Sequence, residues 1–149
     1  MAMTMSGEVQ LPASREVVWA MLNDPEILKV SIPGCETLEK VSDTEFAAVA
    51  VNKIGPVKAR FKGRVTLSDL DPPNGYRISG QGDGGVAGFA KGGAAVALAE
   101  KDGGTLLTYN VEAQIGGKLA QLGQRLINGA AKKLADEFFE KFANAVASR

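Results

Sequence analysis

The N-terminal part of the chain has the residue spacing of one strand followed by two short helices. Residues 8–11 predict a short strand that ends at Pro12. The next apolar residues recur at intervals of three and four positions, as on one face of a helix. Ser14 stands where the N-cap of this helix is expected. Asp24 and Pro25 suit the start of a second helix, because aspartate caps free N–H groups and proline fits the first helical turn.

The spacing of apolar residues falls to two from Cys35 onward and returns to three or four after Gly117. The first stretch predicts about six antiparallel strands, separated by turns rich in glycine, proline, asparagine and aspartate. The second predicts one long amphipathic helix over residues 119–146. Since both must bury an apolar face, we expect an α+β fold in which a curved antiparallel sheet wraps around the C-terminal helix. No linker divides the chain, which predicts one domain over residues 1–149.

The strand predicted over residues 57–67 has the clearest alternation in the sequence. Its apolar side chains alternate with the basic side chains of Lys58, Arg60, Lys62 and Arg64. We therefore expect one face of this strand to pack on the core and the other to face solvent. Two interpretations of the basic face stay open: a solvated strand face, or a surface that docks to an acidic protein or to anionic lipid headgroups.

Glycine is concentrated in one short segment, with seven glycines between residues 80 and 93. They formally match a dinucleotide-binding fingerprint, but the segment after them is too rich in glycine for the helix that this motif requires. One interpretation of the glycines is strand curvature and turns. The other is that small residues leave an open space between sheet and helix, lined by Gly63, Gly82, Gly88, Ala90 and Ala95.

The composition excludes most familiar catalytic machinery. The 149 residues include no histidine and one cysteine, which excludes His-based nucleophilic pairs, His-ligated metals and multi-cysteine metal sites. The 17 basic and 17 acidic side chains give zero net charge, which argues against nucleic acid as a partner. Neither a secretory signal nor an apolar stretch long enough to cross a bilayer is visible, so we expect a cytoplasmic protein.

Several motifs stand in order along the chain and resemble one known family. They are Pro33-Gly34-Cys35-Glu36, Gly85-Val86-Ala87-Gly88-Phe89-Ala90 and the segments at residues 53–59, 116–123 and 132–139. Together they resemble the CoxG family of carbon monoxide dehydrogenase subunits, within the START/polyketide cyclase-like (SRPBCC) superfamily. The resemblance runs over nearly the whole chain. It implies a helix-grip fold: a seven-stranded antiparallel sheet around a long C-terminal helix, with a ligand cavity between them. This agrees with the curved sheet, the long helix and the two short helices after the first strand that the spacing predicts.

The resemblance also implies a role. Members of the family are encoded with molybdenum-containing carbon monoxide dehydrogenases and related hydroxylases, and they resemble accessory proteins that help link the enzyme to the cytoplasmic membrane. We therefore expect a non-catalytic accessory protein of a molybdenum hydroxylase of the CO dehydrogenase type. It would hold a hydrophobic small molecule, an isoprenoid quinone or a lipid, without a tightly bound cofactor or a metal. Its membrane contact would be peripheral, at the inner face of the membrane.

The expected site combines a cavity with a docking surface. We expect the mouth of the cavity near the short helices and the loop from Val86 to Phe89. The expected lining residues are Leu28, Ile32, Pro33, Val49, Phe61, Gly63, Val65, Ile78, Gly82, Phe89, Leu107, Tyr109, Val111, Leu119, Leu122, Leu126 and Ala130. The expected docking surface is the basic face formed by Lys58, Arg60, Lys62 and Arg64.

Two other functions stay open. Relatives on this fold include cyclases and hydrolases, and an enzyme of this kind would need Tyr109, Glu112 or Asp83 as its acid or base. The other is a docking module that contacts its partner through the basic face and holds no ligand.

Overall fold

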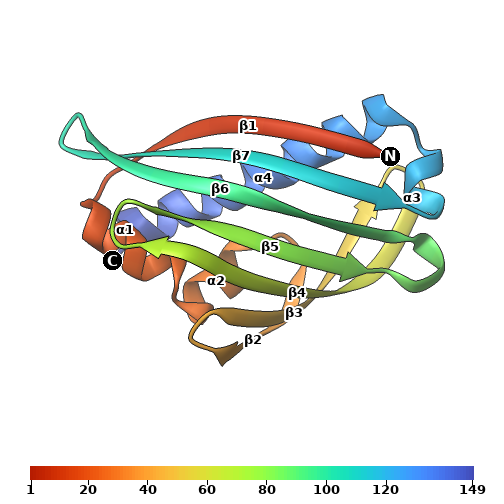
Figure 1. Ribbon diagram of the computed structural model, residues 1–149, viewed down its shortest axis with the longest axis horizontal. Coiled ribbons are helices and arrows are strands. Elements are labelled where there is room, and N and C mark those ends of the chain that lie inside the picture. The colour runs from red at the N-terminus through yellow and green to blue at the C-terminus, as the bar shows by residue number, and fades with distance from the viewer.

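The computed structural model describes residues 1–149 and contains one seven-stranded antiparallel sheet. Its strands are β1 (Ala2–Leu11), β2 (Cys35–Ser42), β3 (Glu45–Ile54), β4 (Val57–Asp71), β5 (Gly75–Asp83), β6 (Phe89–Lys101) and β7 (Gly104–Gly116). They lie in the order β1-β7-β6-β5-β4-β3-β2, so that β2 to β7 form consecutive hairpins and β1 pairs with β7 (Figure 1). The predicted antiparallel sheet is confirmed, although β1 begins at Ala2 rather than at Glu8.

Two short helices, α1 (Arg15–Leu22) and α2 (Pro25–Ser31), connect β1 to β2. The Ser14 hydroxyl accepts a hydrogen bond of 3.3 Å from the backbone N–H of Val17. The Asp24 carboxylate accepts one of 2.9 Å from the backbone N–H of Glu26. Both predicted N-caps are therefore confirmed, and each satisfies an N–H group that the first helical turn leaves free.

The predicted long helix is interrupted near its start. The structure has a short α3 (Lys118–Gln121) and then α4 (Gln124–Ala147). Gly123 stands between them with a φ of 91°, a conformation that L side chains rarely adopt. The expectation of one continuous helix from residue 119 is therefore wrong for its first turn. No helix in the chain is apolar over enough of its length to span a bilayer.

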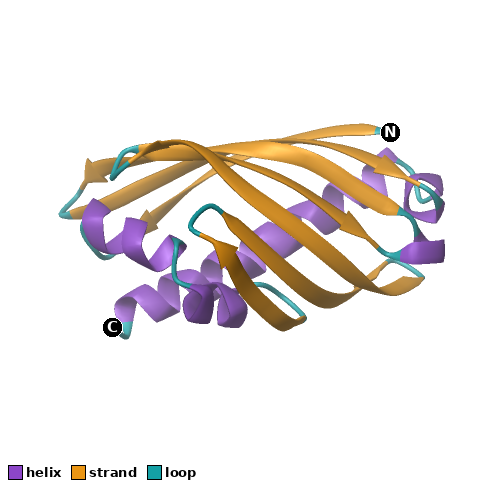
Figure 2. Cartoon of the chain, turned by 60° about the horizontal axis from the view of Figure 1, so that its bottom comes forward, coloured by secondary structure: helices purple, strands orange, loops and turns teal.

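α4 lies along the inside of the curved sheet, with α1 and α2 near its C-terminal end (Figure 2). Two groups of buried side chains hold it there. The larger group packs the last turns of α4 against α1, β1 and β7, through residues that include Leu11, Val18, Leu107, Phe142 and Val146. The smaller group lies at the α3 end and consists of Met3, Ile115, Leu119 and Ile127. The helix is thus packed against the sheet near both of its ends.

The strand register separates an inner face from an outer face. On β4 the apolar residues point inward, whereas Lys58, Arg60, Lys62 and Arg64 are exposed on the outside. The prediction of one packed and one solvated face is confirmed for this strand. Paired residues on neighbouring strands share a face of the sheet, so the register also shows which residues of the other strands face outward. Val49 is paired to Lys62, and Phe89 is paired to Asp83.

Candidate ligand-binding cavity

An apolar cavity of about 470 Å³ lies between the inner face of the sheet and the helices α3 and α4. It is bordered by β1, β3, β4, β5, β6 and β7 on one side and by the first half of α4 on the other. Its lining residues are Met3, Met5, Asn52, Ile54, Phe61, Gly82, Ala90, Val111, Ala113, Ile115, Leu119, Ile127, Ala130, Ala131, Leu134 and Ala135. Natural interiors contain few voids larger than one water molecule, which occupies about 30 Å³ in the liquid. This space is therefore a cavity rather than a packing defect.

Small side chains on both sides keep the cavity open. Ala131 and Ala135 are four residues apart on α4 and so lie on the same face of the helix. Across from them the sheet contributes Gly82, Ala90 and Ala113. A Cβ atom built on Gly82 would meet no other atom within 4 Å, which shows that this glycine borders open space. The sequence-based interpretation of small residues as spacers is supported at Gly82 and Ala90.

The chemistry of the cavity is that of an apolar container. Of the 16 lining residues 14 are hydrophobic, and none has a side chain that titrates. Asn52 is the one polar side chain in the set. Such a site can bind hydrocarbon surface by the hydrophobic effect, at about 25 cal/mol per Å² removed from water. It contains no acid or base that could transfer a proton.

The expected lining residues fall into three groups in the structure. Phe61, Gly82, Val111, Leu119 and Ala130 line the cavity. Other inward-facing residues belong to the larger core group or pack against it, namely Leu28, Val65, Ile78, Leu107 and Tyr109. The third group neither lines the cavity nor belongs to the larger core group. It consists of Ile32, Pro33, Val49, Gly63, Phe89, Leu122 and Leu126. The cavity therefore lies toward the α3 end, farther from α2 than the sequence predicted.

The register corrects the expected orientation of three residues. Val49 lies opposite Lys62 and Phe89 lies opposite Asp83, so both are on the outer face, where Phe89 is 44% exposed. Ala95 pairs with Arg77 and with Asn110 and also faces outward. None of these side chains can reach a ligand between the sheet and α4, because successive strand residues point to opposite faces.

Sequence reasoning missed the contribution of β1. Met3 and Met5 line the cavity from this edge strand, next to Val111 and Ala113 of β7. The signal was present in the alternation of Met3 and Met5 with Thr4 and Ser6, which is the period of a half-buried strand. Methionine side chains are flexible and adapt to irregular apolar surfaces, which suits the wall of a binding site.

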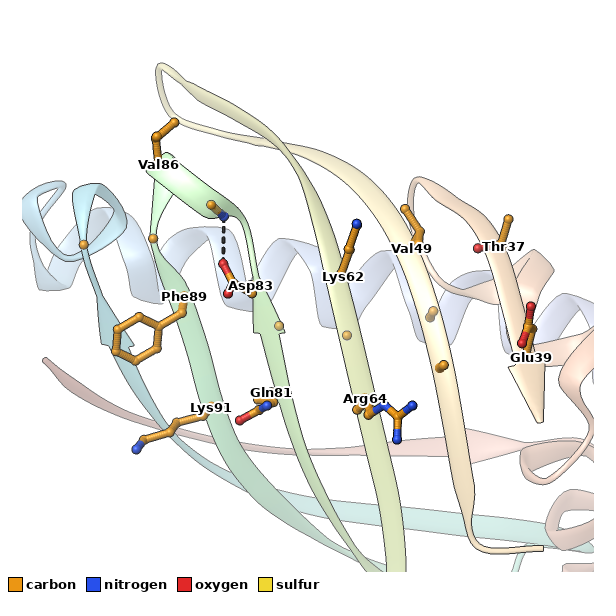
Figure 3. A pocket seen from close by; sticks show the side chains of 17 residues that line it. Thr37, Glu39, Val49, Lys62, Arg64, Gln81, Asp83, Val86, Phe89 and Lys91 are labelled. Carbon is orange, nitrogen blue, oxygen red and sulfur yellow. Dashed lines mark hydrogen bonds between the residues drawn. The ribbon is translucent and has the colours of Figure 1, made fainter. Parts of the chain in front are cut away.

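The outer face of the sheet has a larger but polar hollow. Figure 3 shows it from the side away from α4, with Lys62, Arg64, Gln81, Asp83 and Lys91 around it. It measures about 810 Å³, and only 5 of its 17 lining residues are hydrophobic. This balance of polar and apolar residues is typical of a solvated surface or a protein contact and is unsuited to an apolar ligand.

Two of the four expected docking cations are already paired. Arg60 lies 3.1 Å from the Glu36 carboxylate, and Arg64 lies 2.6 Å from that of Glu45. Lys58 and Lys62 have no ionic partner in the structure. The net positive charge of this face at β4 is thus smaller than the sequence alone suggests.

Comparison with known proteins identifies the family. A model of the CoxG family of carbon monoxide dehydrogenase subunits matches residues 7–147. The chain belongs to the CoxG family. A crystal structure of a conserved protein from Geobacillus kaustophilus is 34% identical and superposes with a TM-score of 0.92, covering 98% of this chain and 96% of that one. No curated protein matches this CoxG-family chain.

More distant structures share the fold alone. A START superfamily protein from Mycobacterium smegmatis is 13% identical, with a TM-score of 0.73 over 97% of each chain. The di-domain ARO/CYC BexL from the BE-7585A biosynthetic pathway is 11% identical, with a TM-score of 0.69 over 99% of this chain and 51% of that one. The CoxG-family chain therefore has a START-like, SRPBCC-type fold, as the sequence predicted.

The groups that an enzyme on this fold would need do not converge in this CoxG-family chain. Asp83 is on the outer face, where its carboxylate accepts a 2.7 Å hydrogen bond from the Gly85 N–H. Glu112 is also exposed on the outer face. The Tyr109 ring is inside, stacked on Phe139 with 5.0 Å between ring centroids. These three residues therefore provide no acid–base pair around a common substrate position.

Cys35 has no features of a nucleophile. Burial raises the pKa of its thiol above the ordinary value, although the charge of Lys29 acts in the opposite direction. Its Sγ donates a 3.3 Å hydrogen bond to the carbonyl of Thr37. A thiol held in its neutral form reacts slowly, because the thiolate is the nucleophilic species.

Proposed function

We propose that this protein is a non-catalytic carrier of a hydrophobic molecule, an isoprenoid quinone, that serves a molybdenum hydroxylase of the CO dehydrogenase type. The single observation that carries the proposal is the apolar cavity of about 470 Å³ under α4. Its volume lies within the range of about 300–1,000 Å³ that is usual for small-molecule sites. Membership of the CoxG family supplies the enzyme class, because the family is described as a subunit of carbon monoxide dehydrogenase.

A carrier is favoured over a catalyst by the composition of the site. No titratable side chain lines the cavity, and the chain has no histidine. The burial of a long apolar tail needs only nonpolar walls, which 14 of the 16 lining residues provide. A quinone suits such a site chemically, because it joins an apolar tail to a small polar ring and is the membrane electron acceptor that such a dehydrogenase requires.

The proposal includes a link between the enzyme and the membrane. The outer face of β4 would contact an acidic surface of the partner enzyme, using the unpaired cations Lys58 and Lys62. The opposite side of the sheet would hold the ligand. A carrier with these two separate surfaces could stay bound to the enzyme while it exchanges its ligand.

Analysis of the bound molecule tests the proposal directly. The protein is purified from its native host without detergent, extracted with organic solvent and analysed by mass spectrometry, and the apo form is then offered decylubiquinone. We expect a co-purified quinone or related isoprenoid lipid in the extract and uptake of the probe by the apo form. A protein that is empty on purification and takes up no decylubiquinone would exclude the carrier function.

A further inference from the structure

Asn52 is the exception in an otherwise apolar wall. It lies on the inner face of β3, between Ala50 and Ile54 and opposite Ala59 on β4. All its neighbours on this face of the two strands are apolar, and an aliphatic residue at position 52 would extend that surface. The carboxamide of Asn52 instead borders the cavity. Its polarity therefore has no explanation in the packing of the sheet.

The carboxamide of Asn52 makes no hydrogen bond within the protein. None of the side-chain hydrogen bonds of the structure involves Asn52, which is half-buried. A carboxamide has two N–H donors and a carbonyl acceptor, and neither polar atom of Asn52 is fully shielded from solvent, so water can occupy these positions until a ligand enters. Asn52 thus has unused hydrogen-bonding capacity at the wall of the cavity.

The adjoining turn leaves Asn52 accessible. Gly34, just before β2, has a φ of 72°, and its carbonyl accepts a 2.9 Å hydrogen bond from the N–H of Val51. A Cβ atom at Gly34 would clash with the Val51 carbonyl oxygen and would lie 3.3 Å from the Asn52 Oδ1, so the backbone requires a glycine where the turn passes the carboxamide. The turn is held against β3 at a residue that has no side chain, and Asn52 beside it is half-buried rather than buried.

Asn52 also lies at one end of the cavity. Along the sheet order, β3 and β1 provide the two outermost strands of the lining, with Asn52 on β3 and Met3 and Met5 on β1. Four strands lie between β3 and β1, and neighbouring strands are about 4.8 Å apart, so Asn52 and the two methionines are at opposite ends of the lining. The cavity is therefore polar at its β3 end and apolar, with flexible walls, at its β1 end.

From this polarity we infer that Asn52 is the headgroup-recognition residue of the cavity, and that the ligand is an amphiphile with a carbonyl oxygen at one end. The Asn52 N–H donates a hydrogen bond to this oxygen, and the hydrocarbon tail extends across β4 to β7 toward Met3 and Met5. The inference rests on the proposed carrier function, which it deepens by assigning the residue that recognises the headgroup and the direction of the ligand in the cavity.

Two probes of matched tail length separate recognition of the headgroup from simple apolar binding. Decylubiquinone has two ring carbonyls, and decylbenzene has none. Dissociation constants are measured by fluorescence displacement for the full-length protein, Asn52→Leu and Asn52→Gln. We expect Asn52→Leu to weaken decylubiquinone binding about tenfold and to leave decylbenzene binding within twofold, the change expected for one neutral hydrogen bond. Asn52→Gln keeps a carboxamide and should recover part of the loss.

A spectroscopic readout reports the hydrogen bond itself. In infrared spectra, the carbonyl stretching band of bound decylubiquinone should lie at lower frequency in the wild-type protein than in Asn52→Leu. Retained decylbenzene binding shows that the variant is folded. Equal decylubiquinone affinity and an unchanged carbonyl band in Asn52→Leu would overturn the role of Asn52 while the carrier function stands. If neither probe binds the wild-type protein, the carrier function fails as well.

Discussion

Gly82 controls how much space remains under the middle of the sheet. It faces inward from β5, has no positive φ, and a Cβ atom there would meet nothing within 4 Å. A side chain at this position can therefore enter the cavity without strain. Gly82→Leu should weaken decylubiquinone binding by at least tenfold, because the leucine occupies ligand volume. Its melting temperature should be unchanged or higher, because glycine within a strand is unfavourable.

Ser79→Leu is the matched control for this substitution. Ser79 lies on the same strand but is exposed on the outer face, where it pairs with Thr66 and Gly93. The added leucine should leave ligand binding within twofold. Isothermal titration calorimetry and thermal unfolding of both variants check the pair. If the two substitutions reduced binding equally, the ligand site would lie outside the cavity.

Two phenylalanines compare a ring buried under the sheet with a ring exposed on its outer face. Phe142 on α4 has 0% exposure and belongs to the larger core group, whereas Phe89 is 44% exposed. Phe142→Ala should lower the free energy of unfolding by about 3–5 kcal/mol, as is usual when a buried aromatic ring is removed. Phe89→Ala should change it by less than about 1 kcal/mol. Urea denaturation measures both, and a larger loss at Phe89 would contradict the register of β6.

At the scale of elements, the break between α3 and α4 depends on one glycine. Gly123 has a φ of 91°, whereas Gly129 lies inside α4 and is exposed. Gly123→Ala should destabilise the fold by about 1 kcal/mol, because alanine disfavours positive φ. Gly129→Ala should stabilise it by up to about 1 kcal/mol, because alanine favours the helix and its Cβ meets no neighbour. Chemical denaturation would contradict the break if both substitutions shifted stability in the same direction.

The order of elements could be predicted because the relevant signals are local. Ser14 and Asp24 cap helices by hydrogen bonds to residues two or three positions ahead, and alternation on β4 distinguishes its faces directly. The break at Gly123 could not be predicted from such local signals. Apolar residues recur at helical spacing on both sides of it, and a single glycine is compatible with a continuous helix.

The cavity was harder to predict, because it depends on strand register. The segment from Phe46 to Val51 is apolar at every position, so its sequence cannot show whether the Val49 side chain lies on the inner or the outer face of the sheet. Pairing with Lys62 decides this, and pairing is a long-range property. The spacer role of Gly82 could be predicted from the cluster of glycines, whereas the partner alanines on α4 were recognised in part, at Ala130 only.

At the scale of the whole molecule, the sheet separates an apolar inner site from a polar outer surface. If the outer face of β4 docks to the partner enzyme, the double variant Lys58→Glu and Lys62→Glu should weaken binding of the purified dehydrogenase by at least tenfold at low salt. The added negative charge would repel an acidic partner surface. The effect should shrink as salt increases, because exposed charges are screened.

Lys133→Glu with Lys141→Glu provides the control, since both lysines are exposed on α4. This variant has the same change in net charge but leaves the β4 surface intact. Surface plasmon resonance should give unchanged dehydrogenase binding for it. Equal losses for the two double variants would indicate an effect of net charge rather than a docking surface on β4.

The central claim is that the ligand lies between the sheet and α4, and alanine methyl groups on both faces allow one measurement to test it. The protein is labelled with ¹³C at alanine methyls and titrated with decylubiquinone. We expect chemical-shift changes and ligand-to-methyl NOEs at Ala113, Ala131 and Ala135, which line the cavity. Ala47 and Ala95 border hollows on the outer face and should not change. NOEs confined to Ala47 and Ala95, or no change at any alanine, would contradict the carrier account.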